Sequence, residues 1–312
     1  MSTGMFRGVD HVGLGVGDLD RALAFYGRVG FSELVFAYEG VVPGLDFLGG
    51  RDRTARVAMV ANPAATPVGP GRLKLVQVLD GDGPPPAPAG QGWGEIGVCE
   101  ICLHVRGVQQ VHDRLVADLG ARSLMAPLSG AVSPNDVSLD IAYVADPWGG
   151  KLELIEWTGL WHSLPGPARA EGVNHVAFGV KDMARSRAFY EQLGFTEMLF
   201  ESLDFFEPMA PWYPYGSPDQ HMIMMLASQG AAIEPVVLDP EGPDCRGEWG
   251  HIGPFDFAVG VTSLERGLDV LLAMGVETGE PVTVDIGGGG EWRYASFRDP
   301  DDLYVTLVEA RY

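Results

Sequence analysis

One stretch of about twenty residues occurs twice in this chain of 312 residues. It runs from Asp10 to Phe31 as DHVGLGVGDLDRALAFYGRVGF and returns from Asn174 to Phe195 as NHVAFGVKDMARSRAFYEQLGF. Four residue types keep one register between the two copies, in the pairs His11 and His175, Asp18 and Asp182, Tyr26 and Tyr190, and Gly30 and Gly194. Chance does not preserve such a set, so the chain contains a duplication and is built from copies of one unit.

The repeated stretch predicts a strand that leads into a helix. Apolar residues alternate with other residues over 11–16, which is typical of a strand with one apolar face. Asp18 can cap a helix, and apolar residues then recur at helical spacing from Leu19 onward until Gly30, which is suited to end it. This pattern places His11 on the strand face that points away from the helix.

The rest of the chain indicates four such units, each with a strand, a helix and about three further strands. They span about 6–80, 95–157, 172–239 and 250–312. The segment GDGPPPAPAGQG at 81–92 is rich in proline and predicts a semi-rigid connector. A second proline-containing boundary at 159–172 separates the two halves. We therefore expect an α+β fold with helices on one face of curved sheets, in two domains at 1–158 and 170–312.

The composition limits the classes of partner and the compartment. A formal net charge of −21 argues against nucleic acids and anionic membranes, both of which attract basic surfaces. No apolar run approaches the roughly 18 residues of a membrane span, and from the first residues, MSTGMFRGVD, which have no long apolar core, we expect no signal peptide. Three cysteines do not make a disulfide framework, so we expect a cytoplasmic protein.

The duplicated motif resembles the vicinal oxygen chelate superfamily, the glyoxalase, bleomycin-resistance and extradiol-dioxygenase group. The residues that carry this resemblance are the two copies above and the endings DPWGGKLELIE at 146–156 and DPDDLYVTLVE at 299–309. Together they cover nearly the whole chain. The resemblance implies paired βαβββ modules, with each pair forming a U-shaped sheet that cups a metal ion. Four modules then imply two such cups.

The resemblance also implies four metal ligands in each cup, on the first and last strands of its two modules. In the first half these positions are occupied by His11, Gln77, Glu100 and Glu153. This set suits a divalent cation such as Zn, Ni, Co, Mn or Fe, although many relatives carry a histidine where this chain has Glu100. Glu153 also interrupts an apolar strand, and a buried carboxylate is costly unless it is paired or bound to metal.

Each of the four residues has an ordinary structural explanation when it is taken alone. His11 is suited to be a satisfied core histidine and Gln77 to be a surface or core amide. Glu100 and Glu153 are suited to be carboxylates at a strand edge or in an ion pair. The prediction of a metal site therefore depends on their joint occurrence at the four family positions.

The equivalent positions of the second half are His175, Val236, Asp256 and Thr306. Valine cannot bind a metal ion, so we expect this second cup to be degenerate. Asp256 would then be a structural carboxylate or contact a substrate. Whether His175 and Asp256 serve a functional role is left open by the sequence.

These residues favour a metal-dependent isomerase or lyase of the glyoxalase or epimerase type. Its small substrate would offer two adjacent oxygens, and Glu153 or Glu100 would act as general base beside a metal-stabilised oxyanion. A homodimer is compatible with this hypothesis. One alternative is an extradiol ring-cleavage dioxygenase, whose iron sites use two histidines and one carboxylate. Another is a metal-free protein that binds an apolar compound, which the aromatic segment FFEPMAPWYPY at 205–215 favours.

Overall fold

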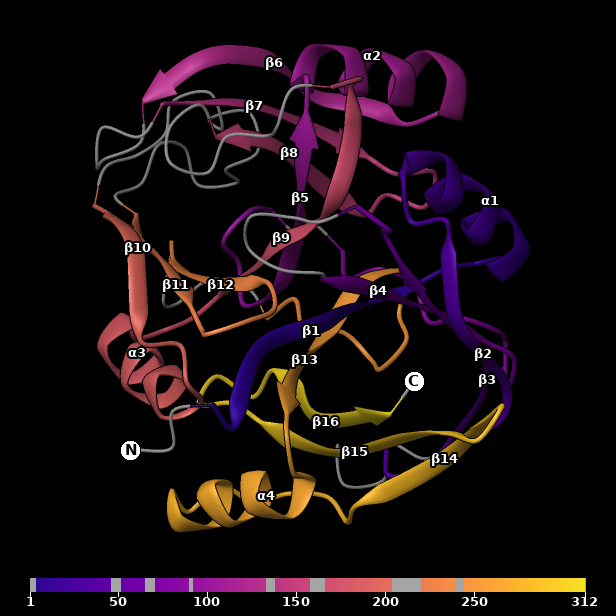
Figure 1. Ribbon diagram of the computed structural model, residues 1–312, viewed down its shortest axis with the longest axis vertical. Coiled ribbons are helices and arrows are strands. Elements are labelled where there is room, and N and C mark those ends of the chain that lie inside the picture. The colour runs from indigo at the N-terminus through magenta and orange to yellow at the C-terminus, as the bar shows by residue number, and fades with distance from the viewer. Residues whose placement is uncertain are drawn as a thin grey trace.

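Four βαβββ modules follow one another in a computed structural model of the chain (Figure 1). The structure describes residues 4–45, 52–64, 71–89, 92–132, 138–157, 166–203, 220–238 and 244–311. The first module contains β1 (Phe6–Gly15), α1 (Leu19–Val29), β2 (Glu33–Val42), β3 (Arg53–Ala61) and β4 (Arg72–Val78). The second contains β5 (Gly97–Arg106), α2 (Val108–Leu119), β6 (Arg122–Val132), β7 (Ser138–Ala145) and β8 (Lys151–Trp157).

The second half of the chain repeats this order of elements. The third module contains β9 (Arg169–Gly179), α3 (Met183–Gln192), β10 (Glu197–Ser202), β11 (His221–Leu226) and β12 (Ala232–Val237). The fourth contains β13 (Gly253–Val261), α4 (Leu264–Ala273), β14 (Val282–Gly287), β15 (Gly290–Arg298) and β16 (Tyr304–Arg311). The predicted α+β class and the four modules are thereby confirmed.

The repeated aspartate and glycine perform the local roles that their positions predict. Asp18 accepts a hydrogen bond from the backbone N–H of Arg21 at 3.0 Å and caps α1, and Asp182 caps α3 through Arg185 in the same way. Gly30 ends α1 with a φ of 146°, a backbone angle that favours glycine. Short-range sequence signals therefore determine where these helices begin and end.

The modules assemble into two eight-stranded sheets that cross the halves of the chain. The first sheet has the order β14-β15-β16-β13-β1-β4-β3-β2 and joins the first module to the fourth. The second sheet has the order β10-β11-β12-β9-β5-β8-β7-β6 and joins the second module to the third. We expected each sheet to lie within one half, 1–158 or 170–312, and this strand order corrects that expectation.

Two central strand pairs explain why each sheet contains modules from both halves of the chain. β1 pairs antiparallel with β13, and β5 pairs antiparallel with β9. Consecutive modules meet instead through buried side chains of their repeated motifs. The Tyr26 hydroxyl donates to Asp146 Oδ2 at 2.6 Å, and the Tyr190 hydroxyl donates to Asp299 Oδ2 at 2.9 Å. The duplicated tyrosine thus ties neighbours in sequence together without placing them in one sheet.

A large apolar core joins the helices to one face of each sheet. It includes Val12 of β1, Ile101 of β5 and the stacked rings of Phe178 and Phe257, whose centroids lie 5.1 Å apart. The opposite faces of the sheets carry two separate apolar clusters, one around Cys102 and Trp157 and one around Phe255 and Trp292. Each of these two faces also holds a small group of buried polar residues.

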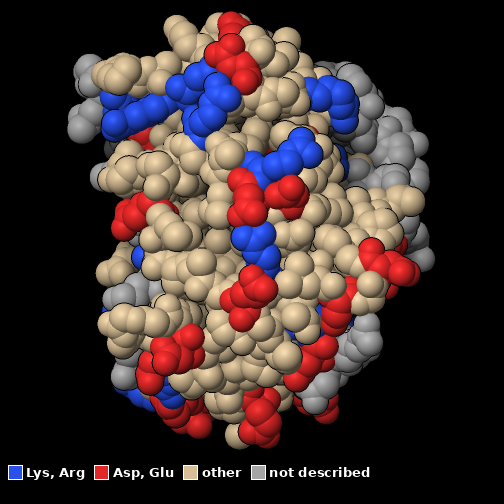
Figure 2. Space-filling model, turned by 90° about the vertical axis from the view of Figure 1, so that its right-hand side faces the viewer, with Lys and Arg blue, Asp and Glu red and all other residues tan. Residues whose placement is uncertain are grey.

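The acidic composition of the chain is visible on its surface. On the face drawn in Figure 2, acidic side chains occur from top to bottom, whereas basic side chains gather mainly in the upper half. No helix within the described residues is both long and apolar enough to cross a membrane. The three cysteines Cys99, Cys102 and Cys245 are buried and free of disulfide bonds.

Candidate metal centre

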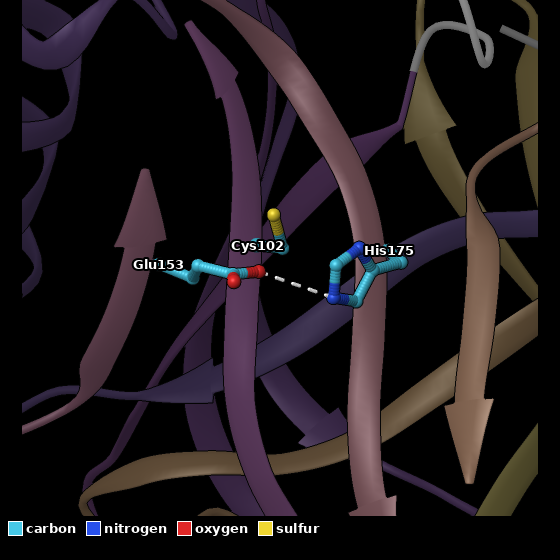
Figure 3. A group of neighbouring side chains, drawn as sticks. All are labelled: Cys102, Glu153 and His175. Atoms are coloured by element: carbon cyan, nitrogen blue, oxygen red, sulfur yellow. Dashed lines mark ion pairs between the residues drawn. The ribbon is translucent and has the colours of Figure 1, made fainter. Parts of the chain in front are cut away.

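Four acidic and imidazole side chains from four adjacent strands of the second sheet converge on one buried point. We call this group the His175 centre; it consists of Glu100 on β5, Glu153 on β8, His175 on β9 and Glu234 on β12. His175 Nε2 lies 3.2 Å from a Glu153 oxygen, 3.5 Å from a Glu234 oxygen and 3.8 Å from a Glu100 oxygen. Figure 3 shows Glu153 and His175 pointing toward each other beside Cys102. The imidazole therefore stands among three carboxylates.

The pairing of the strands explains why these side chains meet. His175 lies opposite Cys102 across the β9–β5 pair, while Glu100 and Glu234 both lie opposite Ala177, from β5 on one side and from β12 on the other. Alternation along a strand places residues two apart on the same face. The sheet thus presents all four side chains on the face that is turned away from the helices.

Neighbouring groups fix the orientation of two members of the centre. The Nδ1 atom of His175 lies 2.8 Å from Asn174 Oδ1, so Nδ1 carries the hydrogen and Nε2 faces the carboxylates. The Tyr143 hydroxyl donates to Glu153 Oε1 at 3.0 Å and leaves Oε2 directed at His175. Supporting groups of this kind are typical of metal sites, where they hold the ligand atoms in place.

Burial and mutual repulsion shift the protonation of the carboxylates. Burial, and then the nearby Glu153, raise the pKa of Glu100 to about 7, and burial raises the pKa of Glu234 to about 8. Burial also acts to raise the pKa of Glu153, but His175 outweighs it and holds that pKa below its usual value. Burial acts to lower the pKa of His175, yet the surrounding carboxylates raise it to about 10. The centre therefore demands positive charge.

The atoms of the centre that lack a hydrogen bond test whether these residues suit a cation. Both oxygens of Glu100, Oε2 of Glu153 and Nε2 of His175 are buried and have no hydrogen-bond partner among the described residues. Such atoms are costly to bury, and a divalent cation satisfies all of them at once. The ligand atoms of Glu100, His175 and Glu234 lie within 4.8 Å of one another. The donor set fits a metal ion.

Cys102 stands beside the centre as a further sulfur atom. Its Sγ lies within 4.8 Å of the ligand atoms of Glu153 and His175. Burial, and then Glu153, raise the pKa of the Cys102 thiol well above its usual value. Cys102 therefore stands as a thiol beside the carboxylates of the centre.

The structure separates the four ligands that we predicted from the sequence. Glu100 and Glu153 belong to the His175 centre, but His11 and Gln77 lie in the first sheet. Gln77 points to the helix side of β4, where its Oε1 accepts from the backbone N–H of Leu19 at 3.1 Å and supports the start of α1. His11 belongs to a different polar group on the other face of that sheet.

Sequence reasoning missed Glu234 and assigned His175 to a degenerate cup. The expectation of a degenerate second cup placed Val236 at the fourth ligand position, two residues beyond the glutamate that reaches the centre. The available signal was the one used for Glu153. Glu234 is the single charged residue of an otherwise apolar strand, AIEPVV. The proximity of Glu234 to Glu100 and Glu153 could not be predicted, because it depends on which strands pair.

The first sheet carries the corresponding group, which we call the Lys74 centre. It consists of His11 on β1, Lys74 on β4, Asp256 on β13 and Thr306 on β16. Lys74 Nζ donates to Asp256 Oδ2 at 2.6 Å, and both side chains are buried. Asp256 and Thr306, which we expected beside His175, therefore lie in the other sheet.

Comparisons with known proteins agree with this architecture. Residues 172–307 match the model of the Glyoxalase/Bleomycin resistance protein/Dioxygenase superfamily. No curated protein matches the sequence. Among solved structures, glyoxalase I from Zea mays is 19% identical with a TM-score of 0.62, and the match covers 97% of this chain and 92% of that chain. A point variant of the maize enzyme is 21% identical with the same TM-score and the same coverage.

A second kind of structure shares the fold at a similar level. A putative dioxygenase from Bacillus subtilis subsp. subtilis strain 168 is 14% identical with a TM-score of 0.61, and the match covers 98% of this chain and 86% of that chain. At such identities the likeness to solved structures is one of fold, and fold alone does not give function. The family match assigns residues 172–307 to the glyoxalase, bleomycin-resistance and dioxygenase superfamily, in agreement with the resemblance of the duplicated motif, and the fold of the whole chain is that of the solved structures.

Proposed function

We propose that the His175 centre binds one divalent metal ion and that the protein is a metal-dependent isomerase or lyase of the glyoxalase type. The observation that carries this proposal is the convergence of three carboxylates and one imidazole, from four strands, on a single buried point. Glu100, Glu153, His175 and Glu234 would hold the ion. A nitrogen and oxygen donor set of this kind suits Zn, Ni, Co, Mn or Fe.

The metal ion would supply Lewis-acid chemistry to a small substrate that offers two adjacent oxygens. The protein supplies the handling of the proton. Glu100 is suited to this task because neither of its carboxylate oxygens has a hydrogen-bond partner among the described residues, so one of them is free to take up and return a proton. Tyr143 anchors Glu153 through Oε1, so Glu153 is suited to remain a fixed ligand. The apolar surroundings exclude water and strengthen these interactions.

The donor set also separates this proposal from the two alternatives. Iron centres of ring-cleavage dioxygenases combine two histidines with one carboxylate, whereas the His175 centre has one histidine and three carboxylates. A metal-free binding protein has no need of three buried carboxylates on one point. The aromatic segment 205–215, which favours that alternative, lies outside the described residues.

Metal content and proton exchange test the proposal together. Elemental analysis of protein purified without chelators is expected to find about one divalent ion per chain. The metal-loaded protein should exchange the C–H proton beside the carbonyl of an α-hydroxycarbonyl compound with D₂O, which NMR detects. Glu153→Gln should abolish exchange and weaken metal binding by more than the roughly 10–100-fold typical of losing a supporting group.

Gln77→Ala is the matched control because Gln77 occupies the last strand of a module but lies outside the centre. It should lower stability by about 1 kcal/mol through the lost bond to α1 and leave metal content unchanged. Wild-type protein without metal, or Glu153→Gln protein with unchanged metal affinity, would contradict the proposal.

A further inference from the structure

The Lys74 centre occupies the same place in the first sheet that the His175 centre occupies in the second. In the second sheet, Glu100 and Glu234 lie opposite Ala177, two residues after His175. In the first sheet, Asp256 and Lys74 lie opposite Gly13, two residues after His11. Each histidine therefore has its neighbours in the same register.

The registers match the two centres residue by residue. His11 corresponds to His175, Asp256 to Glu100, Lys74 to Glu234 and Thr306 to Glu153. Three of these four positions keep a side chain that can offer a nitrogen or oxygen ligand. The fourth exchanges a glutamate for a lysine, so a resident positive charge stands where the other centre has a negative one.

The ion pair of the Lys74 centre fits beside β1 because residue 13 is a glycine. A Cβ atom on Gly13 would lie 1.7 Å from Asp256 Oδ1 and 3.1 Å from Lys74 Cε, which is too close for any side chain. The matching position in the second sheet is Ala177, which has a Cβ and is fully buried. The chain thus carries glycine at the position where the pair needs room.

Two buried atoms of the Lys74 centre lack a hydrogen bond, and both are of the kind that binds a cation. His11 Nδ1 lies 3.0 Å from Asp10 Oδ1 and carries the hydrogen, so Nε2 offers a lone pair. Burial, and then Lys74, lower the pKa of His11 and keep the ring neutral. His11 Nε2 and Asp256 Oδ1 are buried without a hydrogen-bond partner among the described residues. Both atoms are acceptors, and Lys74 acts electrostatically on the His11 ring.

The ammonium group is itself held by its surroundings. Lys74 is 3% exposed and Asp256 is 2% exposed, and a lysine is almost never buried to this extent unless it is paired. The rings of Phe255 and Trp292 lie 5.4 Å and 5.9 Å from Lys74 Nζ, within the range of cation–π attraction. A fixed lysine at this point leaves a metal ion neither space nor favourable charge.

We propose that the Lys74 ammonium takes the place of the metal ion in the first sheet, so that this centre is a latent divalent-cation site kept metal-free by its own lysine. The inference rests on the proposed metal site in the second sheet for its reference geometry. It follows that glutamate at position 74, the residue found at the matching position 234, converts the Lys74 centre into a second metal site.

The test is to count metal ions in Lys74→Glu protein. Elemental analysis after equilibration with Zn²⁺ and gel filtration should rise from about one ion per chain in the wild type to about two. Lys74→Gln, which removes the charge without adding a charged ligand, should remain at about one. The melting temperature of Lys74→Glu protein should rise with Zn²⁺ in excess of the rise of the wild type, because ligand binding stabilises the folded state.

The Glu234→Gln background separates this inference from the proposed function. Glu234→Gln protein should lose its ion, and Lys74→Glu added to it should restore one. A folded Lys74→Glu protein with no more metal than its parent overturns the inference and leaves the proposed function standing. Metal in Lys74→Glu protein but none in the wild type supports the inference and contradicts the proposed function. If Lys74→Glu protein does not fold even with Zn²⁺, Lys74→His, which supplies a neutral nitrogen ligand, decides on the same count.

Discussion

The two polar centres lie at matching positions of two similar sheets, yet they balance their charges differently. The Lys74 centre pairs one ammonium with one carboxylate at 2.6 Å, so these two charges balance. The His175 centre sets three carboxylates around one imidazole. The sheet therefore brings the side chains together, whereas single residues such as Lys74 or Glu234 decide whether a cation is needed.

The difference also appears in the protonation of the two histidines. Burial lowers the pKa of His11, and the adjacent Lys74 contributes to this. In the His175 centre the carboxylates outweigh burial and raise the histidine pKa to about 10. His11 is therefore neutral beside the Lys74 ammonium. His175 is instead protonated and carries the positive charge of its centre, and a metal ion that binds there replaces its proton.

The largest expected effect comes from making the His175 centre resemble the Lys74 centre. Glu234→Lys places an ammonium opposite Ala177, where it can pair with Glu100 as Lys74 pairs with Asp256. Metal content should fall from about one ion per chain to none by elemental analysis. Adding Ala177→Gly should improve folding of the variant without restoring metal, because it reproduces the room that Gly13 provides. Retention of the ion by Glu234→Lys protein would show that the comparison is misplaced.

A smaller but still large effect is expected from pH. A metal ion must displace protons from Glu100, Glu234 and His175, whose pKa values are about 7, about 8 and about 10. Below these values protons compete, so affinity rises as pH rises. The loss of the His175 proton alone raises the metal affinity about tenfold per pH unit below its pKa. The affinity at pH 8 should therefore be at least about a hundredfold higher than at pH 6. Calorimetry in buffers of different ionisation enthalpy counts the released protons, and a pH-independent affinity is the opposing result.

The smallest effect concerns the space beneath the Lys74 pair. Gly13→Ala should lower the free energy of unfolding by about 1–3 kcal/mol, because the new Cβ collides with Asp256 and forces a shift. The mirror change Ala177→Gly should cost only about 0.5–1 kcal/mol, the usual penalty of a glycine in a strand. Urea unfolding measures both. Gly13→Ala should lower the free energy of unfolding by less when Asp256→Ala is already present. An equal loss in both backgrounds would show that a collision with Asp256 is not the cause of the destabilisation.

The choice of ligand residues shows how far sequence reasoning reached. Glu100 and Glu153 were predicted from the ligand positions that the family resemblance implies, and each also lies in a strand that is otherwise largely apolar. Gln77 was chosen three residues away from Lys74, and a shift by an odd number of residues turns a side chain to the opposite face of the strand. The register of a strand depends on its partners, which the local pattern does not contain.

Local sequence patterns were sufficient to find the repeated units, the helix caps at Asp18 and Asp182, and the family resemblance that residues 172–307 bear out. Periodicity and capping act over a few residues, so these features can be found without knowing what lies next to them. The pairing of β1 with β13 and of β5 with β9 became visible only in the three-dimensional fold, and it brings Glu153 to Glu234 across the halves of the chain. Backbone hydrogen bonds between strands are the same for every residue type, so four similar modules can pair in more than one way. The choice among them rests on how whole faces are buried.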